Sequence, residues 1–409
     1  MTGAALWIWF QQIFGPASRR GEEILAFYGH PGELWGRSSR QLREDGKLTS
    51  GEIHRLVPKA EAEAGRIASL CRERGYGILT PDDRAYPLRL RHIQQPPLVL
   101  YVQGELGEID NEAAISIVGS RRCSDYGREA AGHLAQQLAQ AGAVVVSGFA
   151  AGIDAAAHLG ALRARGKTVA VLGCGLDVDY PSGREEMRRM IAATGALVTE
   201  YPPGTQPLSG NFPCRNRILS GLSLGVVVVE GNRHSGSLIT AGLAAAQGRD
   251  VFAVPGSIFS PGSAAPHWLL SQGAIPAATA RDILEEYLEQ YPDRILIERC
   301  QELEDSRLLD QLEEREKTRR TGPSAAPRGE KAPSKASSPP PAAREKAPPP
   351  LTLSSGQRAV YQALEEEPLS VQELMNRAQL PAREVLSALT QLEIEGLAAA
   401  HPGKRYSIP

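Results

Sequence analysis

Cysteine and histidine occur in this sequence without the spacing that disulfide bonds or metal sites require. The five cysteines are scattered singly, with no Cys-x-x-Cys pair, and the histidines form no cluster at ligand spacing. Neither a disulfide scaffold nor a zinc site is therefore indicated. We expect no metal and no other cofactor.

The chain also lacks a long hydrophobic run and an excess of positive charge. The apolar run at residues 4–10 is too short to cross a membrane and lacks a basic leader. Lys and Arg number 45 against 47 Asp and Glu, which gives a net charge of −2. A nucleic-acid partner would therefore have to meet a local basic patch. We expect a cytoplasmic protein with no membrane span.

Apolar residues are abundant enough for more than one core. The chain has 409 residues, of which 42% are hydrophobic, and this length indicates two or three domains. Residues 1–75 have apolar side chains at helical spacing, interrupted by Gly15-Pro16, which predicts a helical domain. Short helices around a Gly-Pro turn resemble a sterile-alpha-motif or helix-hairpin-helix module, and a plain helical packing domain fits equally well.

Alternating strand and helix patterns between about 114 and 290 predict an α/β domain. Such alternation is typical of an extended Rossmann-like, doubly wound and mostly parallel sheet. The predicted strands lie near 115–119, 143–147, 168–172, 196–199, 225–230 and 250–254, and the predicted helices near 126–141, 154–165, 184–194, 214–222 and 237–247. Short apolar runs cut by prolines between 76 and 103 predict edge strands, so the domain should span 76–292.

The C-terminal part changes composition twice. Residues 293–350 form a charged stretch and then a linker of Pro, Ala, Ser and Lys with little to bury. Residues 351–409 regain apolar periodicity, and three short helices followed by turns at Gly396-Leu397 and Gly403-Lys404 predict a winged-helix module with a small β wing. Such a module contacts DNA or protein, and the few basic residues on its third helix, Arg383 being the clearest, leave both open.

The first junction between strand and helix has the composition of an anion site. A buried strand is predicted at 114–118, and Gly119, Ser120 and Arg121 follow it at once. Ser124 then offers a cap for the next helix. Glycine lets a ligand approach the backbone, free amides of a helix N-terminus attract anions, and arginine supplies bidentate charge. A plain turn with solvated arginines fits this stretch alone equally well.

Similar junctions recur along the predicted sheet. Glycines and small hydroxyl residues stand where a strand meets a helix at Ser147, Gly148 and Gly152, at Gly173 and Gly175, and at Ser235, Gly236 and Ser237. Because the carboxyl ends of parallel strands lie at one edge of a sheet, these loops together predict a phosphate-binding crevice.

A further segment, Arg215-Asn216-Arg217, opens the helix before the fifth strand. Solvated helix charges or a salt-bridged brace would both explain arginines here. However, Arg121, Arg215, Arg217 and Arg233 would all lie on the ligand edge of the sheet, which favours a binding path for a polyanion. Unstacked bases could then pack on Phe149 or Phe212.

Single ionisable residues offer little for catalysis. Glu230 closes an apolar strand, but no second carboxylate, Cys–His pair or lysine nucleophile stands beside it. Asp154 lies where a helix N-cap is needed, and His158 on a helix flank is expected to pack rather than react. We therefore expect no catalytic residue.

These motifs together resemble the DNA processing protein A family, also called DprA or Smf. The resemblance is carried by Ile117-Val118-Gly119-Ser120-Arg121 with Ser124 and Tyr126-Gly127, by Ser147-Gly148 with Gly152-Ile153-Asp154, by Phe212-Pro213 with Arg215-Asn216-Arg217, and by Ser235-Gly236-Ser237-Leu238-Ile239-Thr240-Ala241. It covers roughly residues 76–290. It implies a Rossmann domain that binds single-stranded DNA, forms a homodimer and loads the RecA recombinase in natural transformation, without being an enzyme.

The resemblance also implies which residues hold DNA or phosphate. They are Gly119, Ser120, Arg121, Ser124, Ser147, Gly148, Gly152, Arg215, Asn216, Arg217, Ser235, Gly236 and Ser237. Three positions depart from the family pattern: Ala151 replaces a basic residue, Arg184 an Asn that follows Tyr-Pro, and His267 an Asn. The first departure removes one possible DNA contact, which Arg184 could partly replace.

Two other functions fit the same sequence. Rossmann domains with similar glycine-rich edges hydrolyse nucleotide N-glycosidic bonds, and Glu230 would then be the acid. The Pro-Gly-Gly-x-Gly-Thr loop usual in such enzymes is missing. The third candidate is an adaptor that acts mainly through its winged helix.

Overall fold

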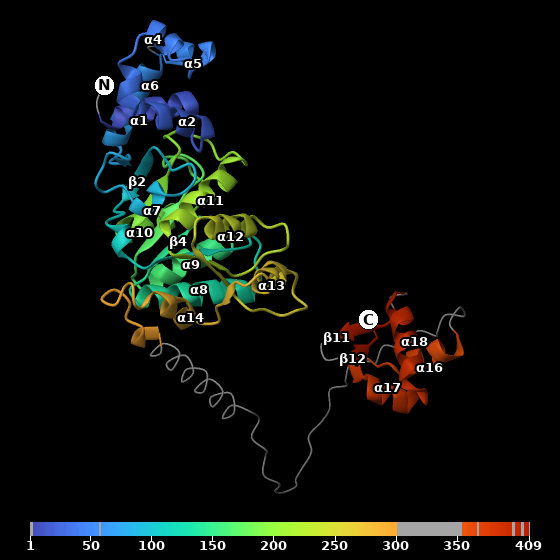
Figure 1. Cartoon of the computed structure of the whole chain (residues 1–409). Helices are drawn as coiled ribbons and strands as arrows, with labels where there is room; N and C mark the ends of the chain where they lie inside the picture. The colour runs from blue at the N-terminus through green and yellow to red at the C-terminus, as the bar shows by residue number, and fades with distance from the viewer. Residues whose placement is uncertain are drawn as a thin grey trace, which may run out of the picture. The chain divides into compact units, whose positions relative to one another are not determined.

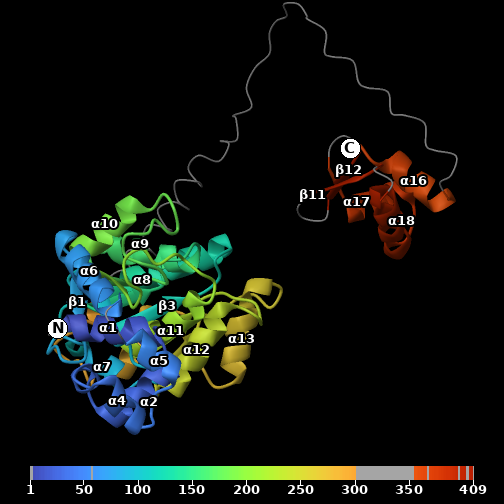
Figure 2. The same ribbon diagram turned by 90° about the horizontal axis from the view of Figure 1, so that it is seen from above.

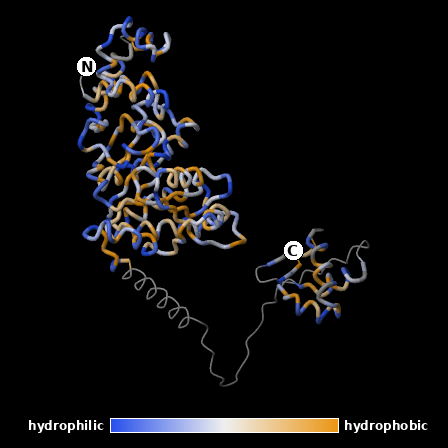
Figure 3. Tube along the Cα trace, in the orientation of Figure 1, coloured by the Kyte–Doolittle hydropathy of each residue, from blue (hydrophilic) through white to orange (hydrophobic). Residues whose placement is uncertain are grey.

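The computed structural model describes residues 3–56, 59–300, 354–365, 368–394, 397–401 and 405–408. The chain divides into two compact units, Met1–Ser324 and Ala325–Pro409, whose elements are labelled in Figure 1. Hydrophobic residues concentrate inside the first unit, as the tube in Figure 3 shows. None of the helices in the described part of the chain has the length and apolarity needed to cross a membrane.

One nine-stranded sheet organises the first unit, in the order β1-β2-β6-β5-β4-β3-β7-β8-β9. Its strands are β1 (Gly77–Leu79), β2 (Leu100–Gly104), β3 (Ala114–Val118), β4 (Val144–Ser147), β5 (Thr168–Val171), β6 (Ala196–Thr199), β7 (Gly225–Val228), β8 (Asp250–Ala253) and β9 (Ile275–Pro276). Strands β3 to β9 pair in parallel, whereas β2 runs antiparallel to β1 and β6 at one edge. The doubly wound, mostly parallel sheet predicted from the sequence is confirmed.

The strand order reverses between β3 and β7, and this switch point determines where a ligand would bind. From β3 the chain proceeds outward through β4, β5 and β6, and from β7 it proceeds the other way through β8 and β9. Loops that leave β3 and β7 therefore diverge and open a crevice outside the carboxyl ends of the strands.

Helices cover both faces of the sheet. They are α7 (Leu88–Arg91), α8 (Asp125–Gln140), α9 (Ile153–Arg163), α10 (Glu185–Thr194), α11 (Asn211–Leu222), α12 (Gly236–Ala246), α13 (Ala264–Ser271) and α14 (Ala280–Leu284). Figure 2 shows α8, α9 and α10 on one side of β3 and α11, α12 and α13 on the other. Each group buries its apolar side chains against one face, so the strands are apolar on both sides.

Helices α8 and α9 pack against each other at very short range. Gly132 of α8 faces Gly160 of α9, and a Cβ on Gly160 would lie only 2.2 Å from the carbonyl oxygen of Gly132. Any larger residue at position 160 would therefore push the two helices apart.

The N-terminal helices share a core with the sheet. They are α1 (Ala4–Phe14), α2 (Arg19–Tyr28), α3 (Pro31–Trp35), α4 (Ser39–Glu44), α5 (Ser50–Arg55) and α6 (Lys59–Glu73). Trp7, Trp9 and Phe10 belong to the same buried cluster as Tyr101 and Leu197 of the sheet. The helical region predicted at 1–75 is thus packed onto the sheet within the first unit.

The second unit has the elements expected of a winged helix. Its described elements are α16 (Ser355–Ala363), β10 (Leu369–Ser370), α17 (Val371–Ala378), α18 (Ala382–Ile394), β11 (Ala399–His401) and β12 (Arg405–Ser407). The three strands pair antiparallel in the order β10-β12-β11, and Val360, Leu374 and Leu389 form the centre of a separate core. The predicted turns at Gly396 and Gly403-Lys404, and residues 301–350 of the predicted charged stretch and linker at 293–350, lie outside the described residues.

Deleting residues 351–409 should leave the first unit folded, because the two units have separate cores. The truncated chain is expected to keep a cooperative thermal transition, followed by circular dichroism in the helical region. A truncated chain without such a transition would show that the second unit is needed for folding of the first.

Candidate nucleic-acid interface

A cavity of about 600 Å³ opens at the switch point between β3 and β7, and we call it the crevice. The loops after β3 and β4 and the first turns of α11 and α12 contribute to its lining. Eight of the predicted site residues line it: Gly119, Ser120, Arg121, Arg215, Asn216, Ser235, Gly236 and Ser237. The crevice therefore lies at the carboxyl ends of the parallel strands, where the sequence predicted it.

The loop after β3 is held by contacts inside the protein. The amide of Ser120 donates to the carbonyl oxygen of Glu230 at 2.8 Å, and the Ser120 hydroxyl accepts the amide of Arg122 at 3.1 Å. A Cβ on Gly119 would lie 2.6 Å from Cγ1 of Ile153. Ser120 thus lines the crevice with its amide already bonded inside the protein, and its expected role in phosphate binding stays a prediction. The loop also positions the side chain of Arg121.

Arg121 forms a wall of the crevice together with two aromatic rings. Its guanidinium carbon lies 5.1 Å from the centre of the Phe212 ring, and the centres of Phe212 and Tyr180 are 5.4 Å apart. The cation is attracted to the face of the ring, which fixes its direction. This wall offers a positive charge for a phosphate next to ring faces for a base.

Arg215 supplies a second, buried charge. It is 4% exposed, and its Nη1 donates to the carbonyl oxygens of Gly148, at 2.7 Å, and Val171. In the described part of the chain its Nε has no hydrogen-bond partner. Burial lowers the pKa of Arg215 to about 10, and Asp154 opposes that shift. The guanidinium therefore stays charged at neutral pH.

Gly148 makes room for this charge. A Cβ at Gly148 would lie 2.7 Å from both terminal nitrogens of Arg215 and 2.7 Å from an Asp154 carboxylate oxygen. Gly148 is thus required for packing of protein groups and does not line the crevice, which corrects its expected role in phosphate binding.

Asp154 is not an N-cap. The N-cap position of α9 is Gly152, and Asp154, the second residue of the helix, accepts the amide of Ala150 at 3.2 Å. Burial raises the pKa of the Asp154 carboxyl above its ordinary value, and Arg215 acts against that rise. The sequence-based prediction was wrong by two positions, because a glycine with positive φ can begin the helix without a side-chain cap.

Arg217 points away from the crevice and forms a buried brace. Its Nη2 donates to both carboxylate oxygens of Glu200, at 2.7 and 2.8 Å, and the two side chains are 5% and 1% exposed. Glu200 also accepts the amide of Ala17 at 3.1 Å, and its carbonyl accepts Nε2 of Gln11 at 3.2 Å. The expected role of Arg217 in binding is wrong, and the salt-bridged brace, the alternative from the sequence, is what the structure shows.

Four other expected contacts also lie elsewhere. The hydroxyl of Ser124 accepts the amide of Gly127 at 3.1 Å as the N-cap of α8 and donates to Glu230 at 2.5 Å. Ser147 is buried and donates to the carbonyl oxygen of Ile117 at 2.6 Å. Gly152 lines a neighbouring groove, and Arg233 is exposed outside the crevice. The hydroxyls of Ser124 and Ser147 therefore form hydrogen bonds with backbone and carboxylate groups of the protein and not with a ligand.

Glu230 has no access to the crevice. It is 3% exposed, does not line the crevice, and accepts both the amide and the hydroxyl of Ser124. Its carboxylate joins the end of β7 to the start of α8, so the N-glycosidic hydrolase alternative loses support for its acid.

His158 is buried, its Nδ1 lies 2.8 Å from Oγ1 of Thr168, and burial lowers its pKa to about 3.

Of the two aromatic residues that the sequence predicted for base stacking, Phe212 lines the crevice and Phe149 does not. Phe149 has a φ of 59° and is 1% exposed beneath Arg184 and Arg188, so it cannot stack on a base. Tyr180 follows β5 and lines the crevice, but it was not predicted from the sequence. Its position in a loop after a parallel strand was the signal that could have found it.

Among the described residues, no three His, Cys, Asp or Glu side chains gather as a metal site would require.

Replacing Arg217 by Ala should lower the free energy of unfolding by about 3–5 kcal/mol, because Glu200 would remain buried without its partner. Urea denaturation of the variant measures this change. The exposed Arg233→Ala is the matched control and should stay within about 0.5 kcal/mol of the parent. Equal stability of Arg217→Ala and the control would contradict the brace.

Comparison with known proteins agrees with this geometry. The family model described as DNA recombination-mediator protein A matches residues 77–288, and that of the DprA winged helix domain matches residues 340–404. DNA processing protein DprA of Bacillus subtilis (strain 168) is 40% identical over 239 residues, covering 58% of this chain and 79% of that protein. Protein Smf of Synechocystis sp. is 37% identical over 342 residues, 80% of this chain and 79% of that protein.

A solved structure agrees as well. The X-ray structure of DNA processing protein A from Streptococcus pneumoniae is 34% identical, has a TM-score of 0.57, and the match covers 70% of this chain and 99% of that chain. The family-model match at residues 77–288 includes all nine strands of the sheet and the residues that line the crevice. The chain therefore belongs to the DNA processing protein A (DprA/Smf) family, a family of DNA recombination mediators.

Proposed function

We propose that this protein binds single-stranded DNA in the crevice and acts as a recombination mediator. The observation that carries the proposal is the wall of Arg121, Phe212 and Tyr180 beside the buried charge of Arg215. One strand of nucleic acid presents phosphates and unstacked bases together, which matches this pairing of cations with ring faces. Family membership supports the same conclusion.

The charges in the crevice favour an anion. Asp154 is its single lining carboxylate, and that group is buried and faces Arg215. The hydroxyls of Ser235 and Ser237, which lie 2.5 Å apart at the start of α12, add hydrogen-bond donors. Because these groups address phosphates rather than base edges, binding should depend little on base sequence.

Family membership supports a proposal about partner proteins. We propose that the chain forms a homodimer through its first unit and loads the RecA recombinase onto DNA in the cytoplasm during natural transformation. The exposed apolar side chains of Ile258, Phe259 and Trp268 on that unit support a protein contact there. We propose no catalytic role for the crevice.

Replacing Arg121 by Ala should weaken binding of a single-stranded oligonucleotide by about 1–3 kcal/mol, the cost of an unmade charge-assisted contact. The slope of log K against log salt should flatten by about 0.7, the contribution of one phosphate contact. Fluorescence anisotropy with a labelled oligonucleotide measures both quantities. Arg233→Ala removes an exposed arginine outside the crevice and should change neither.

The assignment fails if Arg121→Ala keeps the affinity of the parent while its circular dichroism spectrum shows an intact fold. It also fails if duplex DNA binds as tightly as a single strand, because a stiff duplex cannot lay unstacked bases on Phe212.

Loading of RecA can be tested on single-stranded DNA covered by a single-strand-binding protein. The full chain should shorten the lag before RecA hydrolyses ATP on this DNA, and Arg121→Ala should lose the effect in proportion to its lost DNA affinity. An unchanged lag with the parent chain would reject RecA loading and leave the DNA-binding proposal to the oligonucleotide experiment.

A further inference from the structure

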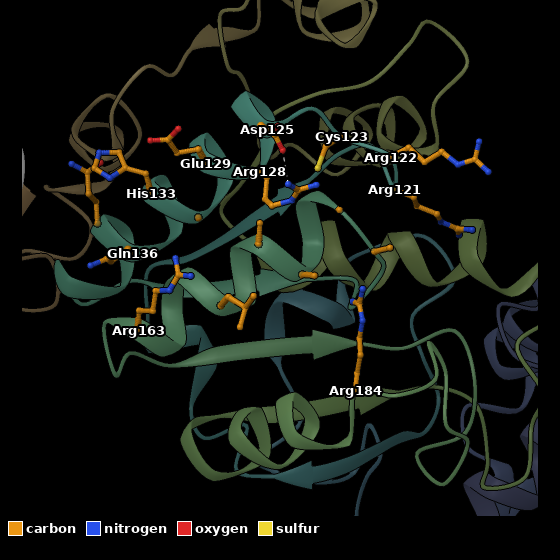
Figure 4. Close-up of a pocket in the computed structure, with 17 residues that line it drawn as sticks. Arg121, Arg122, Cys123, Asp125, Arg128, Glu129, His133, Gln136, Arg163 and Arg184 are labelled. Atoms are coloured by element: carbon orange, nitrogen blue, oxygen red, sulfur yellow. Dashed lines mark hydrogen bonds and ion pairs between the residues drawn. The ribbon is translucent and has the colours of Figure 1, made fainter. Parts of the chain in front are cut away.

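A second and larger cavity, of about 840 Å³, lies along α8 and α9, and we call it the groove (Figure 4). Its lining includes five arginines: Arg121, Arg122, Arg128, Arg163 and Arg184. They come from the loop after β3, from both helices and from the residue that precedes α10. The proposed function used only Arg121, and of the other four arginines only Arg184 was considered for a DNA contact from the sequence.

The groove adjoins the crevice. Arg121 lines both cavities. On the loop after β4 the two linings also meet, since Ala150 belongs to the crevice and Ala151 and Gly152 belong to the groove. Arg121 therefore lies where a polymer would pass from the crevice into the groove.

The floor of the groove is made largely of small residues. Gly132, Gly152, Ala151, Ala155 and Ala156 line it, and none of them carries a side chain longer than a methyl group. Figure 4 shows Arg128 on α8, Arg163 at the end of α9, and Arg184 on a separate segment of the chain. Small lining residues beside several arginines leave room for a polymer backbone along the helices.

The charges of the groove are unbalanced. Among the residues that the structure describes, five arginines of the lining face two carboxylates, Asp125 and Glu129, although the whole chain carries a net charge of −2. Arg128 pairs with Asp125 at 2.7 Å. In the described part of the chain, no carboxylate lies within ion-pair distance of Arg122 or Arg163, which are both exposed. Exposed like charges that repel one another indicate an anionic partner.

The arginines also extend over more length than a single small anion covers, since Figure 4 shows Arg122 and Arg163 at opposite ends of the groove. Gly152 and Arg163 stand at the two ends of α9, an 11-residue helix that spans roughly 16 Å at 1.5 Å per residue. A strand with B-form spacing carries one phosphate about every 3.4 Å of axis, so several consecutive phosphates fit this length.

We propose that the groove holds the segment of single-stranded DNA that continues out of the crevice, with Arg122 and Arg163 at its two ends. This inference rests on the proposed function, since it extends the path of the same strand. Each protein subunit then binds DNA over two connected stretches, the crevice and the groove, joined at Arg121.

Oligonucleotide length separates the two stretches. Thymidine oligomers of about 6 and about 25 nucleotides, within and beyond the usual site size of one small binding fold, are titrated with the full-length protein by fluorescence anisotropy at several salt concentrations. The test variant is Arg122→Gln with Arg163→Gln, which keeps side-chain length at two exposed positions. Arg165→Gln with Arg233→Gln is the matched control, because it removes the same charge from exposed positions outside both cavities.

The long oligomer should lose two phosphate contacts in the groove variant. The slope of log K against log salt should flatten by about 1.4, which amounts to roughly 25-fold weaker binding at 0.1 M salt when the affinities meet at 1 M. The short oligomer should bind the groove variant and the control equally. The single variant Arg163→Gln should give half the change in slope, at the end of the groove farthest from the crevice.

Two outcomes would overturn the groove alone. Either the long oligomer binds the groove variant as it binds the control, or both oligomers lose affinity equally. In both cases the parent still binds single strands and Arg121→Ala still weakens that binding, so the proposed function stands. If the parent binds neither oligomer, the proposed function itself fails and the groove fails with it.

Discussion

A buried ion pair between Arg217 and Glu200 fixes the arrangement on which the crevice depends. Its two side chains join α11, the end of β6 and, through Ala17 and Gln11, the N-terminal helices. Burying two charges is costly, and the cost is offset only when hydrogen bonds satisfy both groups, as they do here. Since Arg217 determines the rotation of α11 about its axis, it also determines which residues of that helix face the crevice.

Helical geometry explains why the two arginines of α11 have different roles. Residues two apart on a helix are separated by about 200° around its axis, so they do not share a face. With Arg217 directed toward Glu200, Arg215 must point to the opposite side, where the carbonyl oxygens of Gly148 and Val171 receive it. The sequence contained this constraint, because both residues lay within a predicted helix. The prediction that both arginines lie on the ligand edge of the sheet did not take this helical constraint into account.

Sequence pattern predicted the sheet, its helices and the position of the crevice, because periodicity and strand order follow from local rules. It did not predict which polar groups form hydrogen bonds inside the protein and are therefore not available to a ligand. Ser124, Ser147 and the amide of Ser120 have the composition of ligand contacts, yet each bonds to Glu230 or to a strand carbonyl. Such partners come from elements distant in sequence, and only the folded chain brings them together. The same reason explains why Phe149 is buried and Tyr180 is not.

Arg215 also differs from Arg121 in how much freedom it has left to lose. Two carbonyl oxygens already hold its guanidinium, so the entropy of ordering this long side chain is spent when the protein folds and not when a ligand arrives. A phosphate that enters the crevice meets a cation in its final place, and less of the interaction energy goes into immobilising the side chain.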